Sequence, residues 1–379
     1  MPFYTKRMVR YLEGKDGHKK KKKDTGSGKG LRVAPSGITG AAGAKAGSAA
    51  VPQTEVLTTA PAEVIADKTF DEKKLLFMKS MLKASVERIN KEKGPFPVKH
   101  RYFSRYTIQQ EEPPVFESPV CKIFKAKHQD FADNGLAAKI YEGEHGIAVD
   151  SLHLKVLRTL GKKHPQIIQT WDIFHNAENN QIYVMQELAN RGSLDKHLEA
   201  NPCDEQQAGK WLSQILKALD YLGDVGISHR SLQPKHVLLT HKDLRAKICG
   251  FANAVIYWDP IKEDIKNCPC LPLESKTTDA PTYQAPEVYG DSSKEEFDPI
   301  VADVWSLGAT FYYMFTKAYP YDFASADANA VSQIQANVDQ IQGLSAEGKK
   351  LLAEMLKPMA VERKHIDKLT TDPFVKKFK

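Results

Sequence analysis

The sequence is organised around residues 227–239, which read Ile227-Ser228-His229-Arg230-Ser231-Leu232-Gln233-Pro234-Lys235-His236-Val237-Leu238-Leu239. Residues 229–236, named here the polar loop, are followed by an apolar run. Other short stretches stand in a fixed order before and after it: Leu136-Ala137-Ala138-Lys139, Gly250-Phe251-Ala252, Ala285-Pro286-Glu287 and Asp303-Val304-Trp305-Ser306-Leu307-Gly308. Each stretch alone is a weak signal, but their order and spacing together indicate one fold.

These stretches resemble the motifs of protein kinases. The polar loop matches the catalytic loop H-R-D-L-x-x-x-N at His229, Arg230 and Leu232. Residues 136–139 match V-A-I-K, and residues 285–287 match A-P-E. The resemblance implies an α+β, two-lobed protein kinase-like fold over residues 102–379. Its small N-lobe would be rich in strands and its larger C-lobe would be helical.

The resemblance also implies which residues hold the fold. In the family, the aspartate at Asp303 braces the catalytic-loop backbone, and an arginine at Arg363 pairs with Glu287. Arg363 could instead be a surface arginine. His229 and Phe251 stand where kinases stack side chains into an internal spine. The structural motif residues are therefore His229, Arg230, Phe251, Glu287, Asp303 and Arg363.

The side chains that carry kinase chemistry are replaced. Ser231 stands at the catalytic base and His236 at the magnesium-binding asparagine. Gly250 stands at the metal-binding aspartate, or Cys249 if the frame shifts by one residue. Removing one charge-stabilising contact typically costs about 10²–10³ in rate, and losses that act as a unit leave little catalysis. The sequence therefore predicts no catalytic residue and no metal site.

The nucleotide-binding loop is changed as well. Aligning its valine with Ile123 places Phe116, Ser118 and Cys121 at the three glycine positions. Bare backbone must approach the phosphates there, and Phe116 is large enough to fill or narrow the cleft.

The phosphate-binding lysine is kept as Lys139, which could still contact a phosphate. Its usual carboxylate partner is replaced by His153, and a neutral imidazole cannot form that ion pair. On the substrate side, the hydroxyl expected three residues before Tyr283 is missing, because Ala280 stands there. We therefore expect ATP binding to be weak or absent, with no magnesium and no other cofactor.

Retained packing beside lost chemistry predicts a catalytically inactive pseudokinase, not an enzyme, that acts as a scaffold or allosteric partner. Its losses are similar to those of the STE20-related adaptor pseudokinases. One alternative is a structural component of a cytoskeletal or ciliary assembly. Another is a protein Ser/Thr kinase in which Asp243, Asp259 or Glu187 supplies the metal site. Residues 297–299 and 319–321 are most similar to the calmodulin-dependent and testis-specific serine kinase branch.

Residues 1–66 differ in composition from the rest of the 379-residue chain. They contain a lysine block from Lys19 to Lys23 and an Ala/Gly-rich linker, within a chain of net charge +7. Such a segment cannot bury enough apolar surface to order itself, so we expect a disordered basic tail. It could contact a polyanion, or serve only for solubility or nuclear targeting.

Other features bear on location and partners. No apolar run approaches the roughly 20 residues that a transmembrane helix needs, and no signal peptide is evident. Five scattered cysteines suit a reducing compartment. We expect a cytoplasmic protein, with a cytoskeletal, ciliary or nuclear location as further options. The expected partner is another kinase or a cytoskeletal assembly.

Periodicity predicts the remaining elements. Between residues 67 and 94, a helix from Asp71, its predicted cap, carries one apolar stripe and either docks on the core or binds a partner. The stripe comprises Leu75, Met78, Leu82, Val86 and Ile89. Strands are expected at 121–127, 136–140 and 181–186. Helices are expected at 148–160, from a cap at Asp204 to about residue 222, and after a cap at Ser345.

Overall fold

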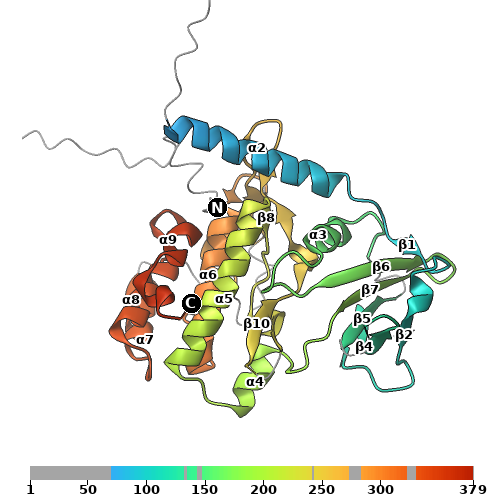
Figure 1. Ribbon diagram of the computed structural model, residues 1–379. Coiled ribbons are helices and arrows are strands. Elements are labelled where there is room, and N and C mark those ends of the chain that lie inside the picture. Colours follow the sequence, from blue (N-terminus) through green and yellow to red (C-terminus); the bar gives the residue numbers. More distant parts are fainter. Residues whose placement is uncertain are drawn as a thin grey trace, which may run out of the picture.

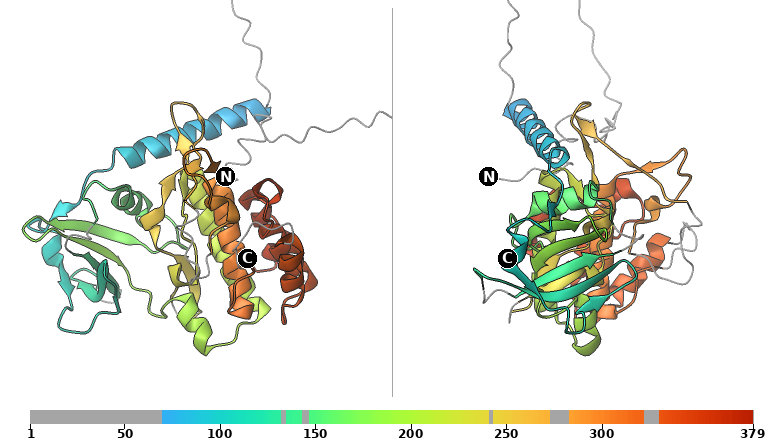
Figure 2. Two further views of the ribbon diagram at one scale, coloured as in Figure 1. Left: turned by 180° about the vertical axis from the view of Figure 1, so that it is seen from behind. Right: turned by 90° about the vertical axis from the view of Figure 1, so that its right-hand side faces the viewer.

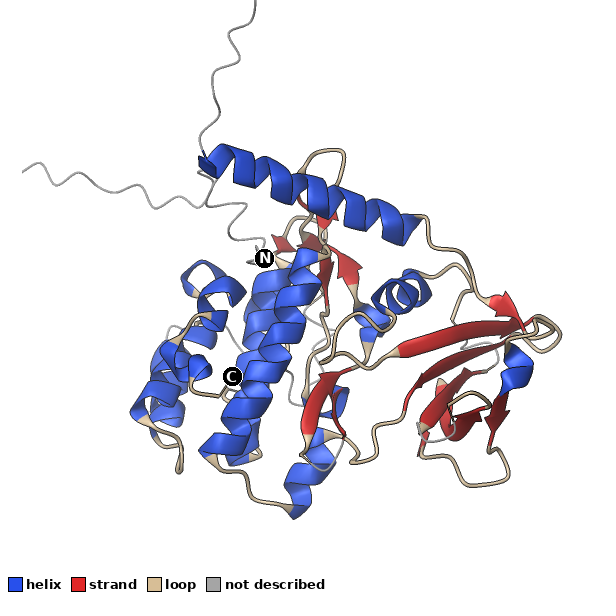
Figure 3. Ribbon diagram, in the orientation of Figure 1, coloured by secondary structure: helices blue, strands red, loops and turns tan. Residues whose placement is uncertain are grey.

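The computed structural model describes residues 70–131, 135–142, 147–240, 243–272, 283–321 and 330–378, with side chains from residue 75 onward. It confirms the predicted α+β, two-lobed fold: a sheet forms the small lobe and helices dominate the large one (Figures 1 and 3). The predicted basic tail with its lysine block, and residues 279–282, lie outside the described residues.

The small lobe is a seven-stranded sheet in the order β1–β6–β7–β5–β4–β2, with β3 paired to β4. Strand β1 pairs with β6 in parallel, and the other neighbours are antiparallel. The strands are β1 (Phe96–Pro97), β2 (Tyr106–Ile108), β3 (Phe116–Glu117), β4 (Cys121–His128), β5 (Leu136–Tyr141), β6 (Thr170–Asn176) and β7 (Gln181–Glu187).

Strand β5 decides which side chains reach the space between the lobes. Successive side chains of a strand point to opposite faces. Leu136, Ala138 and Ile140 pack into the small-lobe core, so Lys139 and Tyr141 face the other way. The alternation of side chains along β5 therefore directs Lys139 into the space between the lobes.

Helix α3 (Leu152–Leu160) packs on β6, in the small lobe. It begins four residues later than predicted, because the Ser151 side chain caps it by accepting a hydrogen bond from the Leu154 backbone N–H at 3.4 Å. The expected strands were found, each extending one residue further than predicted.

The large lobe is built around α5 (Glu205–Asp224) and α6 (Pro299–Thr316), which lie side by side in Figures 1 and 2. Asp204 caps α5 as predicted, accepting from the Gln207 backbone N–H at 2.7 Å. Ser345 likewise caps α8 (Ala346–Met355). The other helices are α4 (Leu194–Ala200), α7 (Ala330–Asp339), α9 (Ile366–Thr370) and α10 (Pro373–Lys376).

Short antiparallel pairs fill the large lobe between these helices. They set the backbone around the polar loop, which lies between β8 and β9. The strands are β8 (Ile227–Ser228), β9 (Val237–Thr240), β10 (Arg245–Ile248), β11 (Val255–Ile256), β12 (Trp258–Asp259), β13 (Asp264–Ile265), β14 (Cys268–Pro269) and β15 (Glu296–Phe297).

Helix α2 (Phe70–Asn90) crosses the outside of both lobes (Figures 1 and 2). Met78, Leu82, Val86 and Ile89 are buried against the core, as the apolar stripe predicts. The helix therefore docks on the core. It begins at Phe70, so Asp71 lies in its first turn and is not its cap.

Candidate functional site

The backbone of the polar loop is held by one buried carboxylate. Asp303 on α6 is only 2% exposed. It accepts hydrogen bonds from the backbone N–H groups of His229 (2.7 Å) and Arg230 (2.8 Å), and from the Ser228 hydroxyl (2.7 Å). Burial raises the pKa of Asp303 to about 6, although these donors act against the shift.

The loop backbone also adopts an unusual conformation at one residue. Arg230 has a φ of +59°, in the left-handed region that side chains other than glycine rarely adopt. Two of the three donors to Asp303, the backbone N–H groups of His229 and Arg230, lie at this turn. The carboxylate therefore offsets the backbone strain and keeps the loop in this shape.

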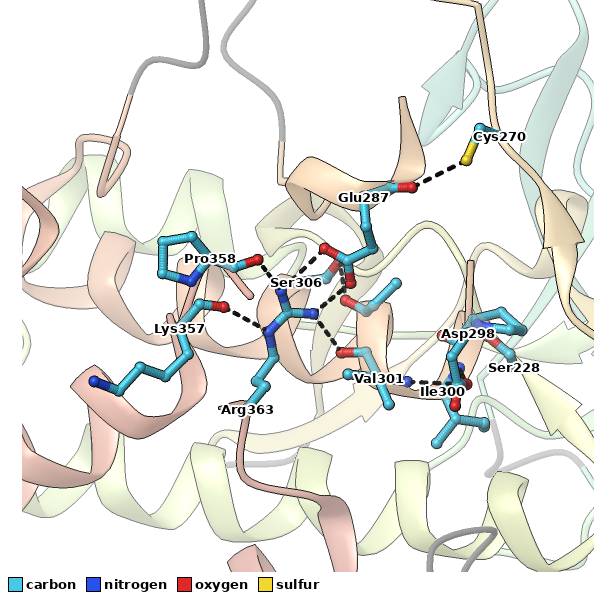
Figure 4. A network of polar contacts seen from close by, with 12 residues as sticks. Ser228, Cys270, Glu287, Asp298, Ile300, Val301, Ser306, Lys357, Pro358 and Arg363 are labelled. Atoms are coloured by element: carbon cyan, nitrogen blue, oxygen red, sulfur yellow. Dashed lines mark hydrogen bonds and ion pairs between the residues drawn. The ribbon is translucent and has the colours of Figure 1, made fainter. Parts of the chain in front are cut away.

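Arg363 anchors the segment around Glu287 next to α6 (Figure 4). Its guanidinium donates to both carboxylate oxygens of Glu287, at 2.6 and 3.0 Å, and to the Val301 carbonyl at 3.0 Å. Further bonds reach the carbonyls of Lys357 and Pro358. Arg363 is 1% exposed and is therefore not a surface arginine.

His229 is buried next to Phe251, with ring centroids 4.9 Å apart. Its Nε2 lies 2.8 Å from the Cys249 carbonyl oxygen, and its Nδ1 accepts from the Ser231 backbone N–H at 3.2 Å. A carbonyl oxygen can only accept, so Nε2 carries the proton. Burial lowers the pKa of His229 to about 4, which keeps the ring neutral.

A cavity of about 460 Å³ lies between the sheet and the polar loop. Apolar side chains from both sides line it, together with Lys139 from β5 and His236 from the loop. Phe116 forms part of its wall but remains 49% exposed. Phe116 therefore does not fill the cleft, and that it narrows the cleft remains a prediction.

Lys139 lies next to Tyr141. Its Nζ is 4.9 Å from the centre of the Tyr141 ring, in a cation–π contact. Burial acts to lower the pKa of Lys139, but Tyr141, Cys121 and Cys249 outweigh it and the net shift is upward. The ammonium group is therefore charged at neutral pH.

His153 takes the place of a carboxylate beside this lysine. It is buried on α3, and its ring packs edge-on against Tyr141. Burial, and then the positive charge of Lys139, lower the pKa of His153 to about 4. His153 is therefore neutral at pH 7 and leaves the charge of Lys139 uncompensated from this side.

Ser231, His236 and Gly250 lie together at the large-lobe side of the cavity. The Nδ1 of His236 lies 2.6 Å from the Ser231 carbonyl oxygen and 3.4 Å from the Ser231 hydroxyl. A β-carbon built at Gly250 would lie 2.7–2.9 Å from the His236 ring. The imidazole thus occupies the space that a side chain at position 250 would need.

The carboxylates considered as metal ligands are held elsewhere. Glu187 lines the cavity but pairs with buried Lys247 at 2.7 Å. Asp243 pairs with Arg245, and Asp259 accepts from the Ile261 and Lys262 backbone in a hairpin. Within the described residues, no group of three or more His, Cys, Asp or Glu side chains could hold a metal ion.

Tyr141 and Asp195 are among the cavity residues that were not predicted from the sequence. Tyr141 follows Lys139 by two positions on β5, so the alternation of strand side chains could have found it. Asp195, on α4, lines the cavity and has one buried carboxylate oxygen, Oδ1, without a hydrogen-bond partner in the described structure. No sequence motif marked it.

Residues 121–375 match the family model described as the protein kinase domain, which covers more than half of the chain. The chain belongs to the protein kinase family. Its relatives include the serine/threonine-protein kinase PLK4 of Drosophila virilis, 27% identical over 262 residues. The same-named proteins of Aedes aegypti and Danio rerio are 28% and 26% identical, over 217 and 215 residues.

The matches cover 67%, 57% and 56% of this chain. They cover only 31%, 26% and 21% of the respective relatives. The chain thus matches about a third or less of these longer kinases. None of them carries the name of a calmodulin-dependent or testis-specific kinase, so that branch remains a prediction.

Membership of the protein kinase family corrects three predictions. A scaffold without catalysis, and a chain that is not an enzyme, are both contradicted by the kinase-domain match and by relatives named serine/threonine-protein kinases. The expected lack of a cofactor is contradicted too, because protein kinases use ATP and magnesium. The replaced motif side chains do not remove the cavity or the ordered polar loop, and both persist beside Lys139, whose retention was already identified from the sequence.

Potential membrane spans were also searched. None of the helices in the described residues combines the length and apolarity that crossing a bilayer requires.

Proposed function

We propose that this chain is a protein Ser/Thr kinase that binds ATP between its lobes and uses non-standard catalytic residues. The observation that carries the proposal is the cavity itself, with Lys139 on one side and the polar loop on the other. Asp303 holds the loop backbone, and Arg363 with Glu287 anchors the segment beside it. The frame that positions reactants in this family is therefore present.

The cavity fits the nucleotide. Val115, Ile123, Ala137 and Leu238 provide apolar surface for a base, and about 460 Å³ lies within the range of small-molecule sites. Lys139 offers an ammonium group, and among the described residues no carboxylate contributes to the shift of its pKa. We assign it to the phosphates, where it would neutralise charge as ATP supplies the phosphoryl group.

The magnesium ions of the family do not fit their two usual positions. Those positions hold the imidazole of His236 and Gly250, which has no side chain. Magnesium prefers oxygen ligands. We therefore assign no step of the reaction to the metal.

His236 is the residue that we assign as general base. Its Nδ1 must carry a proton, because it hydrogen-bonds the Ser231 carbonyl oxygen at 2.6 Å. Nε2 is then the free acceptor. Burial is the main cause that lowers the pKa of His236, so the ring is neutral. Nε2 could take the proton of a seryl or threonyl hydroxyl while that oxygen bonds the γ-phosphorus and ADP leaves.

The test is phosphate transfer by the purified full chain from labelled ATP to itself and to a generic Ser/Thr protein substrate, with magnesium or manganese supplied. We expect incorporation that is lost in Lys139→Met and reduced at least 10²-fold in His236→Gln. Lys125→Met is the matched control, because its side chain is half-exposed on β4. No transfer by the unaltered chain with either metal would refute the proposal.

The remaining assignments are proposals of the same kind. We propose a tail at residues 1–66, a docked helix at 67–94 and a kinase domain at 102–379. The partner would be a protein, in the cytoplasm or on the cytoskeleton or in the nucleus. Affinity purification from native tissue followed by mass spectrometry tests the assignment of a protein partner.

A further inference from the structure

Helix α2 joins the two lobes from the outside. It contacts α3 in the small lobe and β12 in the large lobe. Leu82 and Val86 close over Gly226, where an added β-carbon would lie 3.9 Å from Leu82 and 3.0 Å from Val86, with Trp258 at 3.8 Å. Both side chains are almost fully buried. The helix is therefore fitted tightly to the large lobe.

The chain just after α2 is fastened to α3. Arg158, in the last turn of α3, donates to the carbonyl oxygens of Lys93 (3.3 Å) and Gly94 (2.5 Å). Its guanidinium also lies 4.5 Å from the centre of the Phe96 ring on β1. These contacts tie the C-terminal end of α3 to the connection between α2 and the sheet.

Within the described residues, α3 packs on η3 (Phe251–Asn253) of the large lobe but makes no ion pair on its cavity side. In protein kinases a lysine–glutamate ion pair must be in place there for activity. Here His153 is buried and neutral beside Lys139, so no opposite charge draws α3 toward β5. His153 and Leu157 nevertheless line the cavity, so the position of α3 sets the shape of its wall.

We infer that α2 positions α3 from the outside, in place of the ion pair that the cavity side lacks. Leu82 and Val86 seat the helix on Gly226 and Trp258 of the large lobe, and Arg158 links α3 to the chain that follows it. The large lobe therefore fixes α3 through α2, in addition to the direct packing of α3 on η3. This inference does not depend on phosphoryl transfer.

The first experiment measures amide hydrogen exchange in the full chain carrying Leu82→Ala and Val86→Ala. We expect the amides of residues 152–160 to exchange at least 10-fold faster, with those of α6 unchanged. The matched control is Phe77→Ala with Met81→Ala, because these side chains of the same helix are each 50% exposed. Unchanged exchange in α3, or equal acceleration in α3 and α6, would overturn the inference.

The second experiment restores the missing tie. His153→Glu would place a carboxylate beside Lys139, and in the Leu82→Ala, Val86→Ala background it should return the exchange of α3 to within about 3-fold of the original rate. His153→Gln has similar size and no charge, and should not. Equal rescue by both, or by neither, would overturn the idea that α2 replaces an ion pair. Neither readout uses ATP, so failure of the proposed kinase activity would be seen separately.

Discussion

The imidazole of His236 and the bare backbone of Gly250 fit together. A β-carbon at position 250 would approach Cγ, Cδ2 and Nδ1 of the ring to between 2.7 and 2.9 Å. Gly250 also has a φ of +83°, which glycine adopts readily. A side chain at position 250 would therefore have to displace the ring of His236.

This close approach predicts a coupled effect on stability. Gly250→Ala should lower the free energy of unfolding by about 1–3 kcal/mol, because the new methyl group overlaps the ring. In a His236→Ala background the same change should cost less, leaving only the backbone strain. Urea denaturation of the four proteins measures the difference. Additive effects of the two substitutions would contradict the steric account.

The buried pair of Arg363 and Glu287 should be sensitive to the loss of one partner. Glu287→Gln leaves the guanidinium buried without its counter-ion, and should cost about 3–5 kcal/mol in the free energy of unfolding. Lys294→Gln breaks the exposed pair with Asp291 and serves as control, with a cost of about 0–1 kcal/mol. Similar costs for both variants in chemical denaturation would show that burial does not decide the effect.

Stability should fall as the pH falls below 7. The pKa of His229 is lowered to about 4 in the folded chain, so the unfolded chain binds its proton more readily. The stabilisation is therefore complete above the unfolded pKa of about 6.5 and is lost as the pH falls toward 4. Between pH 7 and pH 5 this one residue should remove about 2 kcal/mol.

The measurement is urea denaturation across that pH range. His229→Asn, although less stable overall, should show a shallower decline. His175→Asn, at a partly exposed histidine on β6, should keep the original slope. A decline of equal slope in the His229 variant would show that groups other than His229 cause the pH dependence of stability.

Nucleotide binding should depend on Lys139. ATP at 100 times its dissociation constant should stabilise the folded chain by about 2.7 kcal/mol, which raises the melting temperature by at least a few degrees. Lys139→Met should lose most of this shift, and Lys125→Met should keep it. Equal shifts in the melting temperatures of both variants would show that Lys139 does not bind the phosphates.

Much of the fold was predictable because it follows from local patterns. The apolar stripe of α2 and the cap at Asp204 each act within a few residues. The start of α3 was missed because the predicted helix began at Ala148, although Asp150 and Ser151 are both residue types that favour a helix cap, and Ser151 makes the cap. Strand β6 (Thr170–Asn176) was missed because its polar positions hide the alternation, while its place is set by pairing with β7.

The site was predictable as a set of positions rather than as a set of contacts. Motif matches located Ser231, His236 and Gly250, but not that the ring of His236 fills the space beside Gly250. Glu187 was considered as a metal ligand from the sequence. In the structure its carboxylate pairs with Lys247, which lies sixty positions later in the chain. Such pairings depend on tertiary distances, which spacing along the chain does not give.

The hydrogen bonds to Asp303 affect which substitutions the polar loop tolerates. Two of its three donors are backbone N–H groups, which every residue except proline provides. Mutation of the side chain at Ser231 therefore leaves this support in place. Position 231 can therefore take other side chains without loss of the loop's shape, which makes it a suitable position for libraries that screen for the proposed phosphoryl transfer.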